Sequence, residues 1–132
     1  MTLRVEVAAA LPPVWGDRVQ LQQVLLNLVL NALEALAEVV QGPCEVVIRA
    51  RPEAAGTVRV AVEDTGVGIA PEQLEAIFTA FYSTKAQGLG MGLAISRTIV
   101  EQHGGRLWAV PHDGPGATVQ FTLRTAPEEG AG

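Results

Sequence analysis

The chain has 132 residues, of which 48% are hydrophobic, and a formal net charge of −5 at pH 7. This length and composition suit one domain with its own core and exclude a disordered segment. The negative charge gives no basic footprint for nucleic acid, no apolar run approaches the ~18–20 residues that span a bilayer, and the first residues do not form a signal peptide. The single cysteine, Cys44, excludes an internal disulfide and is expected to be a small buried residue.

The first half of the chain predicts a strand, a long helix and a hairpin. Residues 3–7 alternate between apolar and polar side chains, as in a half-buried strand. Asp17 is a suitable cap for a helix that runs to about Val40. Residues 45–51 and 57–63 are rich in valine and are separated by a polar turn, which predicts two paired strands.

The second half predicts two helices and a second hairpin. Pro71 opens a short helix, and a further helix runs from about residue 93 to 102 and stops at Gly104. Residues 106–110 and 118–124 predict the closing hairpin. These elements predict an α+β fold, a two-layer sandwich with helices on one face of the sheet. We expect one domain over residues 1–125 and a flexible tail over 126–132.

Two asparagines on the long helix are the most informative feature of the sequence. Asn27 and Asn31 are four residues apart, so they lie on one face of the helix, one turn from each other. Their neighbours are almost all aliphatic, and an unpaired buried amide is costly. A polar group must therefore meet them, either as a cap or cross-link to the sheet or as a nucleotide with its metal.

Asp64 opens a short loop directly after the second strand of the first hairpin, in the pattern Asp-x-Gly-x-Gly. An ionised aspartate only accepts hydrogen bonds, so it suits the exocyclic amine of adenine. Gly66 and Gly68 allow the backbone to approach a flat base closely. The same pattern also occurs in ordinary turns, so the motif alone does not decide between these two interpretations.

A second glycine-rich stretch, residues 88–92, precedes the helix predicted from residue 93. Free N–H groups at the start of a helix suit phosphate. The stretch has neither the spacing of a dinucleotide fingerprint nor the Gly-Lys-Ser/Thr ending of a P-loop. Its alternative interpretation is a flexible connector.

The order of these segments is more specific than any one of them. Paired asparagines, then Asp-x-Gly-x-Gly, then a Phe-Tyr-Ser-Thr-Lys run ending at Lys85, then Gly-x-Gly-x-Gly, resemble the catalytic ATP-binding domain of sensor histidine kinases. That family belongs to the ATPase superfamily of gyrase, Hsp90 and MutL. The likeness extends over about residues 3–124. The runs Gln-Val-Leu-Leu-Asn-Leu-x-x-Asn-Ala and Phe-Tyr-Ser-Thr-Lys look most like the nitrogen-regulation type of kinase.

The resemblance implies a Bergerat-type ATP-binding fold with a mixed sheet, and ATP and Mg²⁺ as cofactors. It implies transfer of the γ-phosphate to a histidine on a separate dimerisation domain, with a response regulator downstream. The domain would then be cytoplasmic, without contact to membrane or nucleic acid, whether or not its parent protein is membrane-anchored. Because the acceptor helix is missing from this chain, the domain alone is expected to bind nucleotide but hardly to turn it over.

The resemblance also implies roles for single residues. Asn31 matches the asparagine that coordinates Mg²⁺, and its amide oxygen is a hard ligand. Asn27 matches a position where gyrase-type ATPases carry a water-activating glutamate, and because an amide cannot act as that base, the match favours a kinase. Asp64 matches the residue that reads adenine. The other predicted cofactor-binding residues surround the Asp64 loop and the ATP lid: Gly66, Gly68, Ile69, Tyr82, Thr84, Lys85, Gly88, Leu89, Gly90, Met91, Gly92 and Leu93.

The chain departs from the family pattern at two places. Many of these kinases carry a lysine three residues after the metal-binding asparagine, where this chain has Glu34. Lys85, the only lysine, is therefore predicted to contact phosphate and to act in catalysis with Asn27; alternatively it is a solvated lid residue. A family Gly-Thr pair appears as Gly116 followed by alanine, and Thr118 comes one position late. A one-residue step turns a strand side chain to the other face, so Thr118 is not expected to take that role.

Neither histidine is expected to accept the phosphate. His103 lies at a predicted helix end, where a cationic imidazole complements the helix dipole, and His112 lies in a predicted turn. Two other functions remain open at this point. One is a serine kinase of the anti-sigma-factor type, which has the same fold, and the other is a nucleotide-binding regulatory module without transferase activity.

Overall fold

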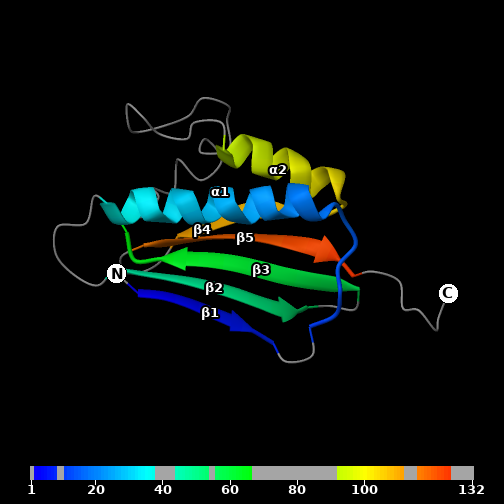
Figure 1. The fold of residues 1–132 in the computed structure, drawn as a ribbon, viewed down its shortest axis with the longest axis horizontal. Helices are drawn as coiled ribbons and strands as arrows, with labels where there is room; N and C mark the ends of the chain where they lie inside the picture. Colours follow the sequence, from blue (N-terminus) through cyan, green and yellow to red (C-terminus); the bar gives the residue numbers. More distant parts are fainter. Residues whose placement is uncertain are drawn as a thin grey trace.

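Five strands and two helices make up the part of the chain that the computed structural model describes, which is residues 2–8, 11–37, 44–53, 56–66, 92–111 and 116–125. The elements are β1 (Thr2–Val7), α1 (Arg18–Ala37), β2 (Glu45–Pro52), β3 (Thr57–Asp64), α2 (Gly92–Gln102), β4 (Leu107–Pro111) and β5 (Ala117–Arg124). Both helices lie on the same side of the sheet (Figure 1). The predicted two-layer α+β sandwich is confirmed.

The sheet is mixed, with strand order β1-β2-β3-β5-β4. β1 pairs in parallel with β2, and the other neighbours are antiparallel. The two predicted hairpins are present as β2–β3 and β4–β5. Because β3 pairs with β5, Asp64 at the end of β3 lies opposite Ala117 at the start of β5. The chain order of the strands thus differs from their order in the sheet.

The core lies between α1 and the central strands. On α1 the buried side chains follow helical spacing at Val24, Leu28, Ala32 and Leu36. They pack with alternate residues of the sheet and with α2, in one cluster that includes Val46, Val62, Leu93, Val100, Leu107, Val119, Phe121 and Leu123. Cys44 packs against this cluster but is half-buried, so the expectation of a buried thiol is only partly met.

α1 is also long and apolar enough to cross a membrane when length and composition alone are considered. Its mean hydropathy over Arg18–Leu36 is 1.2. Glutamine and asparagine side chains interrupt its apolar runs. Since its buried stripe packs on the sheet, α1 occupies the place of a core helix in this fold.

The start of α1 is capped as the sequence predicts. The Asp17 carboxylate accepts a hydrogen bond from the backbone N–H of Gln20 at 3.0 Å, which satisfies a donor that has no partner within the helix. The described part of α1 ends at Ala37, and residues 38–43, where its predicted end falls, lie outside the described residues. The predicted short helix that begins at Pro71 also lies outside them.

His103 joins the end of α2 to the start of α1. Its Nε2 accepts a hydrogen bond from the backbone N–H of Asp17 at 3.0 Å, and its Nδ1 lies 2.7 Å from the carbonyl oxygen of Ile99. A neutral imidazole that carries its proton on Nδ1 satisfies both contacts. His103 therefore links the two helices. The sequence had suggested another role, in which a cationic imidazole complements the dipole of the helix that it ends.

The link predicts a stability effect for His103→Ala. The substitution removes the acceptor of the Asp17 N–H, and because water can reach that exposed group, we expect a loss of about 1 kcal/mol in the free energy of unfolding. Urea denaturation measures it. The matched control is Gln102→Ala, which removes an exposed neighbouring side chain. Equal unfolding midpoints for the two variants would show that the His103 link does not stabilise the fold.

Candidate functional site

The predicted site residues within the described part of the chain gather where α1 meets the end of β3. Asn27 and Asn31 project from one face of α1, and Asp64 ends β3. A Cβ atom added to Gly66 would lie 2.7 Å from the backbone carbon of Ala35, so the loop after β3 packs on α1. Ala35 is one turn beyond Asn31 on the same helix face, which places the Asp64 loop beside the asparagine pair.

Asp64 is a buried carboxylate, with 6% of its surface exposed. Its Oδ1 accepts a hydrogen bond from the backbone N–H of Gly66 at 2.8 Å. The loop is also tied to β2, because the Thr65 N–H donates to the Glu45 carbonyl and the Glu45 N–H donates to the Thr65 hydroxyl. The carboxylate is therefore held in one place by the backbone around it.

Glycine is required at two positions around Asp64 for steric reasons. At Gly116 an added Cβ atom would lie 1.8 Å from the Asp64 carbonyl oxygen, and the φ angle there is +96°. Both features exclude a side chain. At Gly66 the described contact is with α1. This glycine therefore has a packing role in addition to the predicted one, which is to let the backbone approach a flat base.

Asn27 lies between the two helices, with 8% of its surface exposed. Its Oδ1 accepts a hydrogen bond from Gln23 Nε2 at 2.8 Å. Its Nδ2 donates to the Ser96 hydroxyl on α2 at 3.0 Å, and Ser96 is fully buried. The bond to Ser96 makes Asn27 a cross-link to α2, whereas the cross-link considered from the sequence was one to the sheet.

Ser96 and Gln23 were not predicted from the sequence as members of the site. A signal for Ser96 exists, since it interrupts an apolar stripe formed by Leu93 and Val100 on α2. Gln23 lies one turn before Asn27 on the same face. A buried hydroxyl such as that of Ser96 needs a partner, and here Gln23 and Ser96 each form a hydrogen bond with the Asn27 amide.

Asn31 differs from Asn27. It is half-buried, and among the described residues its amide has no hydrogen-bond partner. No cluster of three acidic, histidine or cysteine side chains that would hold a metal occurs within the described ranges.

The remaining predicted residues divide into two sets. Gly92 begins α2, and Leu93 is buried at its first turn. The others lie outside the described residues: Gly68, Ile69, Tyr82, Thr84, Lys85, Gly88, Leu89, Gly90 and Met91.

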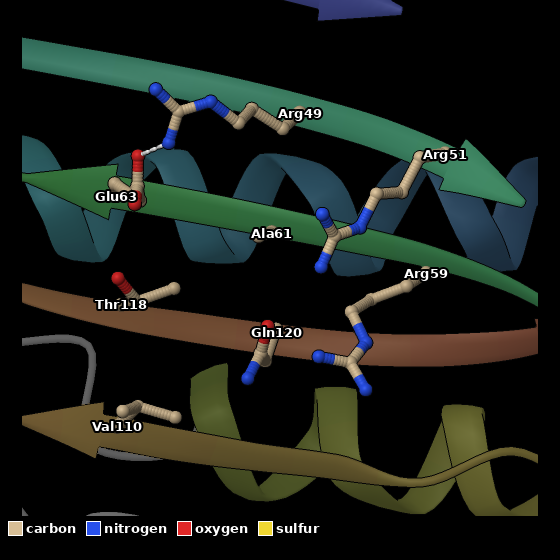
Figure 2. A pocket seen from close by; sticks show the side chains of 8 residues that line it. All are labelled: Arg49, Arg51, Arg59, Ala61, Glu63, Val110, Thr118 and Gln120. Atoms are coloured by element: carbon tan, nitrogen blue, oxygen red, sulfur yellow. Dashed lines mark hydrogen bonds and ion pairs between the residues drawn. The ribbon is translucent and has the colours of Figure 1, made fainter. Parts of the chain in front are cut away.

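The opposite, helix-free face of the sheet carries a hollow of about 420 Å³ (Figure 2). Arg49 pairs there with Glu63 and Glu6, and it lowers the pKa of Glu6 chiefly by a hydrogen bond to that carboxylate. Thr118 lines the same hollow, because it pairs with Glu63 in the sheet. Thr118 therefore points away from the face that carries Asp64, as the one-residue shift in the sequence predicts.

The comparisons with known proteins agree with this geometry. Residues 16–127 match the family described as histidine kinase-, DNA gyrase B-, and HSP90-like ATPase. The sensor protein FixL of Bradyrhizobium diazoefficiens is 47% identical over 115 residues, which are 87% of this chain and 22% of FixL. The chain thus spans less than a quarter of that relative.

Solved structures give the same result. The catalytic domain of histidine kinase ThkA is 34% identical with a TM-score of 0.80, over 94% of this chain and 78% of that one. Full-length ShkA in complex with AMPPNP is 32% identical with a TM-score of 0.79, over 96% of this chain and 26% of ShkA. ThkA in complex with the response regulator TrrA is 33% identical with a TM-score of 0.77, over 96% of this chain and 35% of that one.

The fold, the arrangement of the asparagine pair beside Asp64, and the family match over most of the chain lead to one assignment. The chain belongs to the histidine kinase-, DNA gyrase B- and HSP90-like ATPase family, as an ATP-binding catalytic domain of the sensor histidine kinase type.

Proposed function

We propose that the domain binds Mg·ATP between α1 and the glycine-rich segment that precedes α2, and that within its full-length protein it passes the γ-phosphate to a histidine on a separate dimerisation domain. The observation that carries the proposal is the asparagine pair on α1 beside the buried carboxylate of Asp64. One end of the helix–sheet interface thus offers both a hydrogen-bond acceptor for a base and an amide for a metal.

Asp64 is the proposed adenine reader. Its carboxylate is buried, and one oxygen is already bonded to the Gly66 N–H, which fixes the orientation of the group. A carboxylate in this position accepts a hydrogen bond from the exocyclic amine of adenine, which a guanine base does not offer at the same place. Gly68 and Ile69, which follow in the loop, are proposed to line the base pocket with Gly66.

Asn31 is the proposed Mg²⁺ ligand. Its amide has no partner among the described residues, so its oxygen is available for the metal that bridges the ATP phosphates. When bound, Mg²⁺ would neutralise phosphate charge. The lid residues from Tyr82 to Leu93, with Lys85 as the phosphate-contacting cation, are proposed to complete the site.

The proposed reaction is transfer and not hydrolysis. Phosphoryl transfer depends mainly on positioning and on charge neutralisation. Asn27 is an amide bonded to Gln23 and Ser96, so it supplies no base that would activate water. The γ-phosphate is therefore kept for an acceptor side chain. We propose Asn27 and Lys85 as the residues of this domain that act in the transfer.

The proposed partners follow from the histidine kinase assignment. They are the histidine-bearing dimerisation domain of the full-length protein and a downstream response regulator, and the complex of ThkA with TrrA supports the second. The domain is proposed to be cytoplasmic, to comprise residues 1–125 and to belong to the nitrogen-regulation type, while residues 126–132, predicted as a tail, lie outside the described residues.

Asp64→Asn tests the adenine contact. The amide presents an N–H group to the adenine amine, so we expect ATP affinity to fall about tenfold to a hundredfold, as for loss of a charge-assisted hydrogen bond. Isothermal titration calorimetry measures it. Glu63→Gln is the matched control, because Glu63 is the preceding residue but points to the helix-free face. Unchanged binding by Asp64→Asn would overturn the adenine assignment.

Asn31→Ala tests the metal contact. Without the amide oxygen, ATP should bind equally well with and without Mg²⁺, whereas the native chain should bind more tightly with Mg²⁺. Asn31→Asp serves as the matched variant, since a carboxylate is also a ligand for Mg²⁺ and should retain the difference. The assignment fails if Asn31→Ala keeps the full Mg²⁺ dependence.

Phosphotransfer is tested with radiolabelled ATP. The native chain alone should release phosphate from ATP no faster than the Asp64→Asn variant does. When the dimerisation domain of the full-length protein is added, the native chain should transfer the label to that domain. The label should be lost in acid and survive base, as phosphohistidine does. A label on serine that survives acid would instead support a serine kinase.

A further inference from the structure

A buried hydrogen bond connects α1 and α2. Asn27 Nδ2 on α1 donates to the Ser96 hydroxyl on α2 at 3.0 Å. The two residues are 69 positions apart in the sequence, and Ser96 has no exposed surface. Apolar side chains of both helices, such as Leu28 and Val100, belong to the same buried cluster, and their packing is less directional than a hydrogen bond. The Asn27–Ser96 bond is directional, so it does set register.

The direction of the two helices determines which residues the Asn27–Ser96 bond brings together. α1 and α2 run antiparallel (Figure 1). Asn31 lies four residues after Asn27, and Gly92, which begins α2, lies four residues before Ser96. Both therefore lie toward the same end of the helix pair, about 6 Å along the axes from the bond. The start of α2, where the glycine-rich segment ends, is thus set level with Asn31.

Gln23 determines which way the Asn27 amide faces. Because Gln23 Nε2 donates to Asn27 at 2.8 Å, the atom that receives the bond is the amide oxygen. The amide nitrogen then faces α2, where the Ser96 oxygen accepts from it. A rotated amide would place two donors together at Gln23 and leave the Ser96 oxygen without this donor.

We propose that Ser96 is a positioning residue for the phosphates of the nucleotide. Through Asn27 it holds the register of α2 on α1, so that the N–H groups at the start of α2 and the Asn31 amide face the same phosphate group. Ser96 itself touches no nucleotide. The inference rests on the proposed function, since it takes Asn31 and the start of α2 as the phosphate-binding side of the site.

The proposed role of Ser96 affects the phosphates and the adenine base of the nucleotide differently. We propose that adenine recognition depends on Asp64, which with its loop contacts β2, α1 and the residue before β5. Loss of the Ser96 hydroxyl should therefore weaken binding of the phosphates and leave binding of the base unchanged. A general loss of structure would weaken both. The ratio of ATP affinity to adenosine affinity thus reports on positioning alone.

The experiment compares Ser96→Ala with native protein for binding of Mg·ATP and of adenosine, by calorimetry and by NMR titration of backbone amides. We expect the affinity for Mg·ATP to fall about five- to tenfold, as for one lost hydrogen bond, and the affinity for adenosine to stay the same. Thr98→Ala is the matched control. It removes a hydroxyl from the exposed side of the same helix, where that group donates only to the Ala94 carbonyl at 3.1 Å.

A second variant covers the case in which Ser96→Ala does not fold. Ser96→Cys keeps a similar volume and a weaker acceptor, so its loss of Mg·ATP affinity should be smaller than for Ser96→Ala. Unchanged Mg·ATP binding in these variants, or an equal loss for ATP and adenosine, would overturn the role of Ser96. Absence of nucleotide binding by the native chain would instead overturn the proposed function, so the two failures are distinguishable.

Discussion

The arrangement of this domain depends on the pairing of one buried amide. Asn27 lies in a helix whose other buried positions are apolar, and its amide is bonded on one side to Gln23 and on the other to Ser96. Leaving either end unpaired would cost the desolvation of a buried polar group. The pairing thus fixes α2 against α1, and with it the start of α2 relative to Asn31 and the end of β3.

Steric constraints at the end of β3 supply the other half of the site. Gly116 allows the start of β5 to approach the Asp64 carbonyl, and Gly66 allows the following loop to pack on α1 at Ala35. The buried carboxylate is therefore placed beside the asparagine pair by backbone contacts that no larger residue permits. We propose that a site built in this way holds a nucleotide whose phosphate passes to an acceptor elsewhere.

Local patterns in the sequence predicted most of the fold. Alternation predicted the first strand, and runs separated by turns predicted the two hairpins. Asp17 was predicted to cap α1, and the shift at Thr118 was predicted to turn it to the other face. Contacts between distant segments were not predictable in the same way. The bonds from Asp17 to His103 and from Asn27 to Ser96 join residues 86 and 69 positions apart, and no periodicity encodes which polar residues will meet.

The proposed site is tested most directly by determining the structure of this chain with Mg²⁺ and a non-hydrolysable ATP analogue. We expect the adenine amine within hydrogen-bond distance of the Asp64 carboxylate, the metal on the Asn31 amide oxygen, and the Asn27–Ser96 bond intact. A nucleotide bound elsewhere, or a base in the pocket with its phosphates directed away from Asn31 and the start of α2, would contradict it.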